Sequence, residues 1–120
     1  MTFTAPSAGN RRSHPFLDVR THGFCPYASG ASIPVPELPF RLLSTLARYE
    51  PGTVVSYETL ASVMWPGEVP APYDGSFNDM IQRHLAVLRT LMSVYGNWHP
   101  RLFKVEYGVG IRVQPEHLPR

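Results

Sequence analysis

The sequence contains a single cysteine, Cys25, and no apolar run long enough to cross a membrane. One thiol cannot form a disulfide within the chain or build a cysteine-rich zinc site, and a membrane-spanning helix takes about 20 mostly apolar residues. The N-terminus also lacks the basic and apolar blocks of a signal peptide. We therefore expect a cytoplasmic protein with no membrane segment, in which Cys25 is an ordinary apolar side chain.

Recognisable catalytic and metal-binding patterns are missing as well. The five histidines are scattered, and none stands with a Cys, Asp or Glu at a metal-ligand spacing. The segment Gly108-Val109-Gly110 is not followed by a helix, as a phosphate-binding loop would be, and no nucleophile elbow is present. We expect neither enzymatic activity nor a bound metal or cofactor.

Charge is scarce and unevenly distributed. Charged residues make up 17% of the 120 residues, and the formal net charge is +2. Residues 51–78 contain three acids and no Lys or Arg, whereas residues 79–112 contain five bases and two acids. The second segment therefore carries the basic charge. This amount of positive charge is enough for a small nucleic-acid-binding surface, but it is less than a protein that binds nucleic acid tightly and non-specifically carries.

The chain does contain an ordered series of short elements. Residues 1–13 are small and polar, so we expect a disordered tail. Residues 16–20 alternate apolar and polar side chains, as a half-buried strand does, and the pieces up to residue 36 are short, apolar and interrupted by Ser29-Gly30 and prolines. These features predict a small antiparallel meander at the start of the domain.

Three helices and a hairpin are predicted after the meander. The helices are predicted from apolar residues at helical spacing and from the Pro-Gly and Ser residues that flank them. The strands are predicted from alternating apolar and polar residues. The expected segments are a helix over 38–47, an extended link at 53–55, a helix after Ser56 up to Trp65, a Pro- and Gly-rich loop at 66–75, a helix from Ser76 to Gly96, strands at 102–106 and 111–113 around a tip at 107–110, and a tail at 115–120.

The third predicted helix has the most regular apolar stripe. Ile81, Leu85, Leu88 and Met92 recur at helical spacing and predict one buried face. Two short helices joined by a loop and followed by a hairpin make a helix-turn-helix with a wing. We therefore expect an α+β winged helix-turn-helix domain over residues 14–114, with an N-terminal antiparallel sheet, three helices and a C-terminal β-hairpin.

Four segments, in matching order and spacing, resemble the DNA-binding domain of OmpR/PhoB-type response regulators. The strongest is His-Pro-Arg-Leu-Phe-Lys-Val-Glu-Tyr-Gly-Val-Gly-Ile-Arg-Val at 99–113, which is similar to a family ending in Gly-Val-Gly-Tyr-Arg. The others are Phe-Arg-Leu-Leu at 40–43, Val-Val-Ser-Tyr-Glu-Thr-Leu at 54–60 with Trp65, and His-Leu-Ala-Val-Leu-Arg-Thr-Leu-Met at 84–92. The likeness covers residues 16–113. In most of the family a receiver domain precedes this one, and we expect none within these 120 residues.

The resemblance implies a fold and a mode of binding. The fold includes a four-stranded N-terminal sheet. The third helix would enter the major groove of double-stranded DNA, where base edges carry a full donor–acceptor code, and the wing would reach phosphate or the minor groove. Gln82 and Arg83 are the candidates for base contact, since Gln suits adenine and Arg suits guanine.

The remaining candidate contacts lie on the same helix, before it, and on the wing. His84 and Arg89 match family positions that touch the DNA backbone. Trp65 matches a position whose indole N–H donates to phosphate, and it is equally well explained as a tryptophan that caps the core. The wing supplies its basic residues and its tip: Arg101, Lys104, Arg112 and Tyr107.

The chain departs from the family at the positions that carry charge. Ala86 and Val87 stand where two helix arginines are common, Tyr107 stands where the wing tip has an arginine, and Asp79 stands where a base is common. Exposed apolar residues read thymine methyl groups in some complexes and mark protein-binding surfaces in others.

Two functions therefore remain open. The first is a sequence-specific DNA-binding transcriptional regulator that pairs with a copy of itself or a partner on direct repeats, with the loop at 66–75 contacting RNA polymerase. The second is a winged-helix interaction module with weak or no DNA binding. Such a module would dock a protein, for example of the transcription machinery, through the face of Ala86 and Val87 or through the loop.

Overall fold

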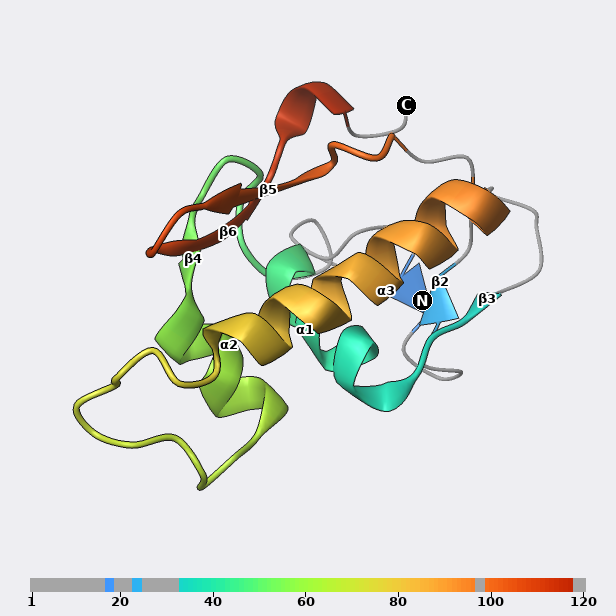
Figure 1. The fold of residues 1–120 in the computed structure, drawn as a ribbon. Coiled ribbons are helices and arrows are strands. Elements are labelled where there is room, and N and C mark those ends of the chain that lie inside the picture. The colour runs from blue at the N-terminus through green and yellow to red at the C-terminus, as the bar shows by residue number, and fades with distance from the viewer. Residues whose placement is uncertain (1–16, 19–22, 25–32, 97–98, 118–120) are drawn as a thin grey trace, which may run out of the picture.

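The computed structural model describes residues 17–18, 23–24, 33–96 and 99–117 of the chain (Figure 1). The first sheet is antiparallel and contains β1 (Leu17–Asp18), β2 (Gly23–Phe24) and β3 (Ile33–Pro34), in that order. Among the described residues the predicted meander is present as three strands, where the resemblance implies four. The tail predicted at 1–13, Cys25 and residues 118–120 lie outside the described residues.

The first helix, α1 (Glu37–Ala47), buries one face in the core and is hydrogen-bonded to the second helix. Pro39 is tolerated in its first turn because the N–H groups there have no partner within the helix. Arg41 pairs with Glu37 one turn earlier, and its Nη1 donates to the carbonyl of Met64 at 2.9 Å. This bond satisfies one of the carbonyls left free at the C-terminal end of the second helix.

The second helix, α2 (Tyr57–Met64), begins where the sequence predicts it. Ser56 is the N-cap, and its Oγ accepts a hydrogen bond from the backbone N–H of Thr59 at 3.2 Å. The helix ends at Met64 with Trp65 as its C-cap, and the Pro- and Gly-rich loop follows. Its buried side is Tyr57, Leu60, Ala61 and Met64.

The third helix, α3 (Asn78–Gly96), is the longest element and packs against both α1 and α2 (Figure 1). It begins two residues after Ser76. The turn before it is held by hydrogen bonds from the backbone N–H of Phe77 to the Tyr73 hydroxyl and from that of Asn78 to the carbonyl of Gly75. Ile81, Leu85, Leu88 and Met92 are buried, which confirms the predicted apolar stripe.

The C-terminal sheet has three antiparallel strands in the order β4-β6-β5. The predicted hairpin is confirmed as β5 (Phe103–Glu106) and β6 (Gly110–Val113). Part of the predicted link is in fact a strand, because β4 (Val55–Ser56) pairs with Ile111 and Gly110. Gly110 permits this pairing, since a Cβ there would lie 2.0 Å from the carbonyl oxygen of Val55.

Helices and C-terminal sheet share one core. Buried side chains from all six of these elements form a single cluster, which includes Leu42, Leu60, Leu88, Phe103 and Ile111. After β6, Pro115–His117 form a short 3-10 helix, and the rings of His117 and His99 stack with centroids 3.8 Å apart. Among the described helices, none combines the length and apolar character needed to cross a membrane.

Candidate nucleic-acid interface

The face of α3 opposite the core is open to solvent and carries one basic side chain. Gln82, Arg83, Ala86, Val87 and Thr90 are all exposed there. Arg83 makes no hydrogen bond or ion pair with any described residue, so its five N–H donors are available to a ligand. Val87 is 43% exposed, and with Ala86 it forms an apolar patch where two positive charges were common in the resembled family.

Gln82 is exposed but already engaged. Its Nε2 donates to the hydroxyl oxygen of Tyr57 at 2.9 Å, which links α3 to the first residue of α2. A glutamine that reads adenine uses its amide nitrogen and oxygen together. Gln82 would therefore have to give up the Tyr57 bond in order to read a base, whereas Arg83 is bonded to no residue that the structure describes.

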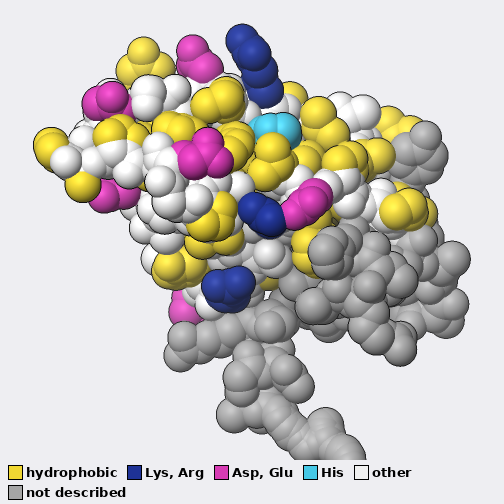
Figure 2. All heavy atoms as spheres, turned by 90° about the horizontal axis from the view of Figure 1, so that it is seen from below, with side chains coloured by type: hydrophobic (Ala, Val, Ile, Leu, Met, Phe, Trp, Pro, Cys, Tyr) yellow, Lys and Arg dark blue, Asp and Glu magenta, His cyan; other side chains and the backbone are white. Residues whose placement is uncertain are grey.

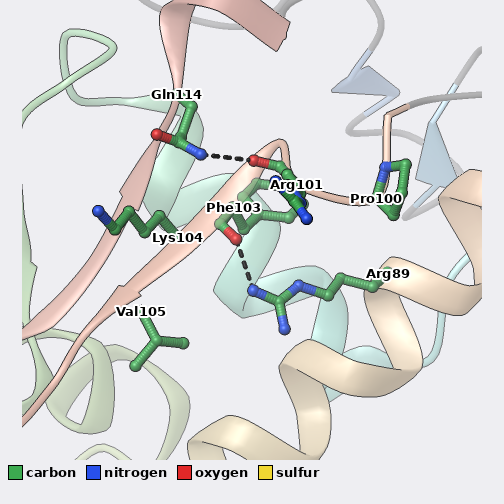
Figure 3. Close-up of a pocket in the computed structure, with 7 residues that line it drawn as sticks. All are labelled: Arg89, Pro100, Arg101, Phe103, Lys104, Val105 and Gln114. Carbon is green, nitrogen blue, oxygen red and sulfur yellow. Dashed lines mark hydrogen bonds between the residues drawn. The ribbon is translucent and has the colours of Figure 1, made fainter.

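Arg89 points away from the outer face toward the hairpin. Figure 3 shows its guanidinium beside the carbonyl oxygen of Phe103, to which Nη2 donates. The side chain is half-buried, and burial lowers the pKa of Arg89. Arg89, which the sequence analysis predicted to touch the DNA backbone, has a structural role within the domain, because its guanidinium joins α3 to β5.

Trp65 and His84 are brought together with a residue that the sequence analysis did not single out. The Trp65 ring lies 5.0 Å from the ring of Phe77 and 5.9 Å from that of His84, centroid to centroid, both at 50°. Burial lowers the pKa of His84, so its neutral form is favoured. This aromatic cluster, Trp65, Phe77 and His84, fixes the join between α2, the loop and α3 by packing.

The wing cations are partly neutralised within the hairpin. Lys104 and Arg112 face each other across β5 and β6. Glu106 Oε2 lies 2.8 Å from Arg112 Nε and 4.0 Å from Lys104 Nζ. The Arg112 contact is an ion pair by distance, although its N–H does not point at the oxygen and no hydrogen bond forms. The sequence analysis missed this effect of Glu106 on the wing cations. Which side chains meet across two strands depends on the register in which the strands pair.

The wing tip is apolar and projects from the domain. Tyr107 is 96% exposed, and Val109 beside it is also exposed. The tip is held to α2, because the backbone N–H of Tyr57 donates to the carbonyl of Val109 at 3.1 Å. Asn78 at the start of α3 and Gly108 at the tip line one shared pocket, which places the wing beside the N-terminal end of α3.

The positive charge of the site is dispersed. Arg101 and Lys104 border a pocket with Arg89, while Arg83 stands apart on the outer face of α3. Figure 2 shows one face of the molecule on which hydrophobic side chains predominate and the Lys and Arg side chains lie separately. Within the described ranges, no three His, Cys, Asp or Glu side chains come together as a metal site.

Comparison with protein-family models and with curated proteins gives no match to this chain. The described residues show a small α+β domain with three helices and a C-terminal β-hairpin, and the function has to be inferred from the geometry of the chain's own residues.

Proposed function

We propose that this chain is a winged helix-turn-helix domain, of the kind found in OmpR/PhoB-type regulators, that binds double-stranded DNA sequence-specifically. The observation that carries the proposal is the exposed outer face of α3. It holds Arg83, which has no partner among the described residues, and the β5–β6 hairpin lies beside its N-terminal end. A free helix flanked by a hairpin is the arrangement that winged-helix proteins present to DNA.

The dimensions of α3 suit the major groove. Its 19 residues span about 28 Å, and the groove of about 12 Å admits one helix. Arg83 lies in the second turn, near the end of a recognition helix that usually contacts base edges. A bidentate bond from Arg83 to guanine would supply the main polar contact, and Ala86 and Val87 would lie against thymine methyl groups.

A salt series on selected and random duplexes tests the proposal. Because few cations face outward, we expect a selectable site and a log–log salt slope that corresponds to a small number of phosphates. Arg83→Ala should cost about 1–3 kcal/mol and relax specificity at one base pair. Arg48→Ala is the matched control, since Arg48 is exposed just after α1 and does not belong to α3. Equal weakening on all duplexes would show that Arg83 contacts only the backbone.

The second candidate is a protein-docking module. Exposed apolar side chains favour it, since Val87, Val94 and Tyr107 lie on the outer face of α3 and at the wing tip. Apolar patches of this kind are common in protein-binding surfaces. Failure to enrich any duplex, together with a binding signal that does not depend on salt, would favour this candidate over DNA recognition.

A further inference from the structure

The pocket beside the hairpin tip has a volume of about 450 Å³ and lies where the loop at 66–75, the start of α2 and the N-terminal end of α3 meet (Figure 1). Tyr73 lines it from the loop, Glu58 from α2, and Val109 from the hairpin tip. Its volume is within the range of about 300–1,000 Å³ that is usual for small-molecule sites. A ligand in this pocket would therefore contact elements that are far apart in the sequence.

The pocket carries one negative charge that nothing in its lining offsets. Glu58 is the single charged residue among the described residues that line it, and no Lys or Arg is among them. The Glu58 carboxylate makes no hydrogen bond or ion pair with another described residue. Burial raises the pKa of the Tyr73 hydroxyl, and the negative charges of Asp74 and Glu58 act in the same direction. The negative charge of this region thus reaches the wall of the pocket.

Several hydrogen-bond donors at the pocket are already used within the domain. The Tyr73 hydroxyl donates to Asn78 Oδ1, and the backbone N–H of Asn78 donates to the carbonyl of Gly75 at 3.1 Å. The first backbone N–H of α2 likewise donates to the carbonyl of Val109 at the hairpin tip. N–H groups in the first turn of a helix attract anions when they are free, and these two are not. The free carboxylate of Glu58 instead favours a ligand group that carries donors and positive charge.

We propose that this pocket binds a small organic cation, an ammonium or guanidinium group on an apolar body, with Glu58 as its counter-charge and the Tyr73 ring as its wall. An ammonium group has donors and no acceptor, so it complements a carboxylate that has no partner. A cation within about 6 Å of a tyrosine ring is also attracted by the face of the ring. Pro72 and Val109 supply apolar surface for the rest of the ligand. The inference is independent of the proposed DNA binding, because none of the described lining residues belongs to the outer face of α3.

Three probes of similar shape and different charge test the site at neutral pH and constant ionic strength. They are benzylammonium, which is cationic, benzyl alcohol, which is neutral, and benzoate, which is anionic. In nitrogen–proton spectra of the full chain, we expect benzylammonium to shift the backbone amides of Glu58, Tyr73, Asn78 and Gly108 until the shifts saturate. The dissociation constant should be on the order of millimolar, as suits a small fragment in an open pocket. Benzyl alcohol should bind about fivefold more weakly, the equivalent of one partly exposed ion pair, and benzoate more weakly still.

Glu58→Gln removes the charge and keeps the shape of the side chain. We expect it to weaken benzylammonium binding about fivefold and to leave the binding of benzyl alcohol unchanged. Glu68→Gln is the matched control, because Glu68 is an exposed acid of the adjacent loop that is not among the residues lining the pocket. Tyr73→Leu should weaken benzylammonium binding about two- to fivefold, whereas Tyr73→Phe, which keeps the ring, should bind it like the original protein.

Three results would overturn the proposal. If benzoate binds at least as tightly as benzylammonium, the helix N-terminal ends, and not Glu58, determine the charge preference of the pocket. If Glu58→Gln and Glu68→Gln weaken benzylammonium binding equally, the cation responds to net charge and not to this pocket. If no probe gives saturable shifts at the pocket amides, or if the shifts spread over the whole chain, the pocket is not a site for an organic cation.

Discussion

Arg83 and Arg89 belong to the same helix and have opposite relations to the rest of the domain. Arg83 is exposed and unpaired among the described residues, while Arg89 is half-buried and bonded to the carbonyl of Phe103. A charged side chain in water can bind a partner at little cost. A charged side chain that already donates to a carbonyl group of the protein would leave that oxygen without its hydrogen bond if it moved to a new partner. At the scale of single residues, we therefore propose a recognition role for Arg83, while Arg89 joins α3 to β5.

Glu106 weakens the positive field of the wing. Replacing it with Gln removes the negative charge beside Arg112 and Lys104 and keeps the shape of the side chain. We expect Glu106→Gln to tighten duplex binding by about two- to fivefold at low salt, in line with the value of an exposed ion pair. Fluorescence anisotropy on one duplex measures this change. Glu50→Gln is the control, because Glu50 is exposed near the end of α1, and an equal gain there would contradict a local effect.

Gly110 is required by the close approach of two strands. A Cβ at this position would lie 2.0 Å from the carbonyl oxygen of Val55, so an alanine would have to push β4 away from β6. We expect Gly110→Ala to lower the free energy of unfolding by about 2–4 kcal/mol. At Gly108 (φ +73°) a Cβ meets nothing within 4 Å, and alanine there should cost only about 1–2 kcal/mol of backbone strain. Urea denaturation measures the free energy of unfolding of both variants. Equal stability of the two would contradict the close approach of Gly110 to Val55.

At the scale of elements, long local patterns were predictable and short or non-local features were not. The buried stripe of α3 and the Ser56 cap follow from helical spacing and capping chemistry, and both are present. The two-residue strand β4 has no period of its own and exists only because β6 pairs with it. The bond between Gln82 and Tyr57 joins residues far apart in the sequence, so it depends on the packing of α2 against α3.

The capping of α2 links the helix-turn-helix to the sheet. Ser56 belongs to β4, and its Oγ accepts a bond from the N–H of Thr59 in the first turn of α2. Ser56→Ala should lower the free energy of unfolding by about 1 kcal/mol. Ser62→Ala, at an exposed position inside the same helix, should leave stability unchanged or slightly higher, since alanine favours helix. Thermal unfolding followed by circular dichroism distinguishes the two, and a similar loss in both would contradict the cap.

At the scale of the whole molecule, the domain combines a helix whose dimensions suit the major groove with a weak positive electrostatic field. Its net charge is only +2, and Glu106 offsets part of what the wing contributes. Electrostatic steering and phosphate contacts supply most of the non-specific affinity for DNA, so the DNA binding proposed for a domain of this charge would depend more on shape and on base contacts. The order of elements was predictable from the sequence, but this balance was not, because it depends on which charges the fold brings together.

Arginines placed on the outer face of α3 should restore the missing charge if that face meets DNA. Ala86→Arg combined with Val87→Arg adds two charges at exposed positions beside Arg83. Each new phosphate contact adds about 0.9 to the log–log salt slope, so we expect the slope to steepen by up to about 2 and affinity to rise at low salt. Glu50→Lys changes the net charge by the same amount at an exposed site near the end of α1. An equal change in both proteins would mean that net charge alone acts, and no change in either would mean that this face does not contact DNA.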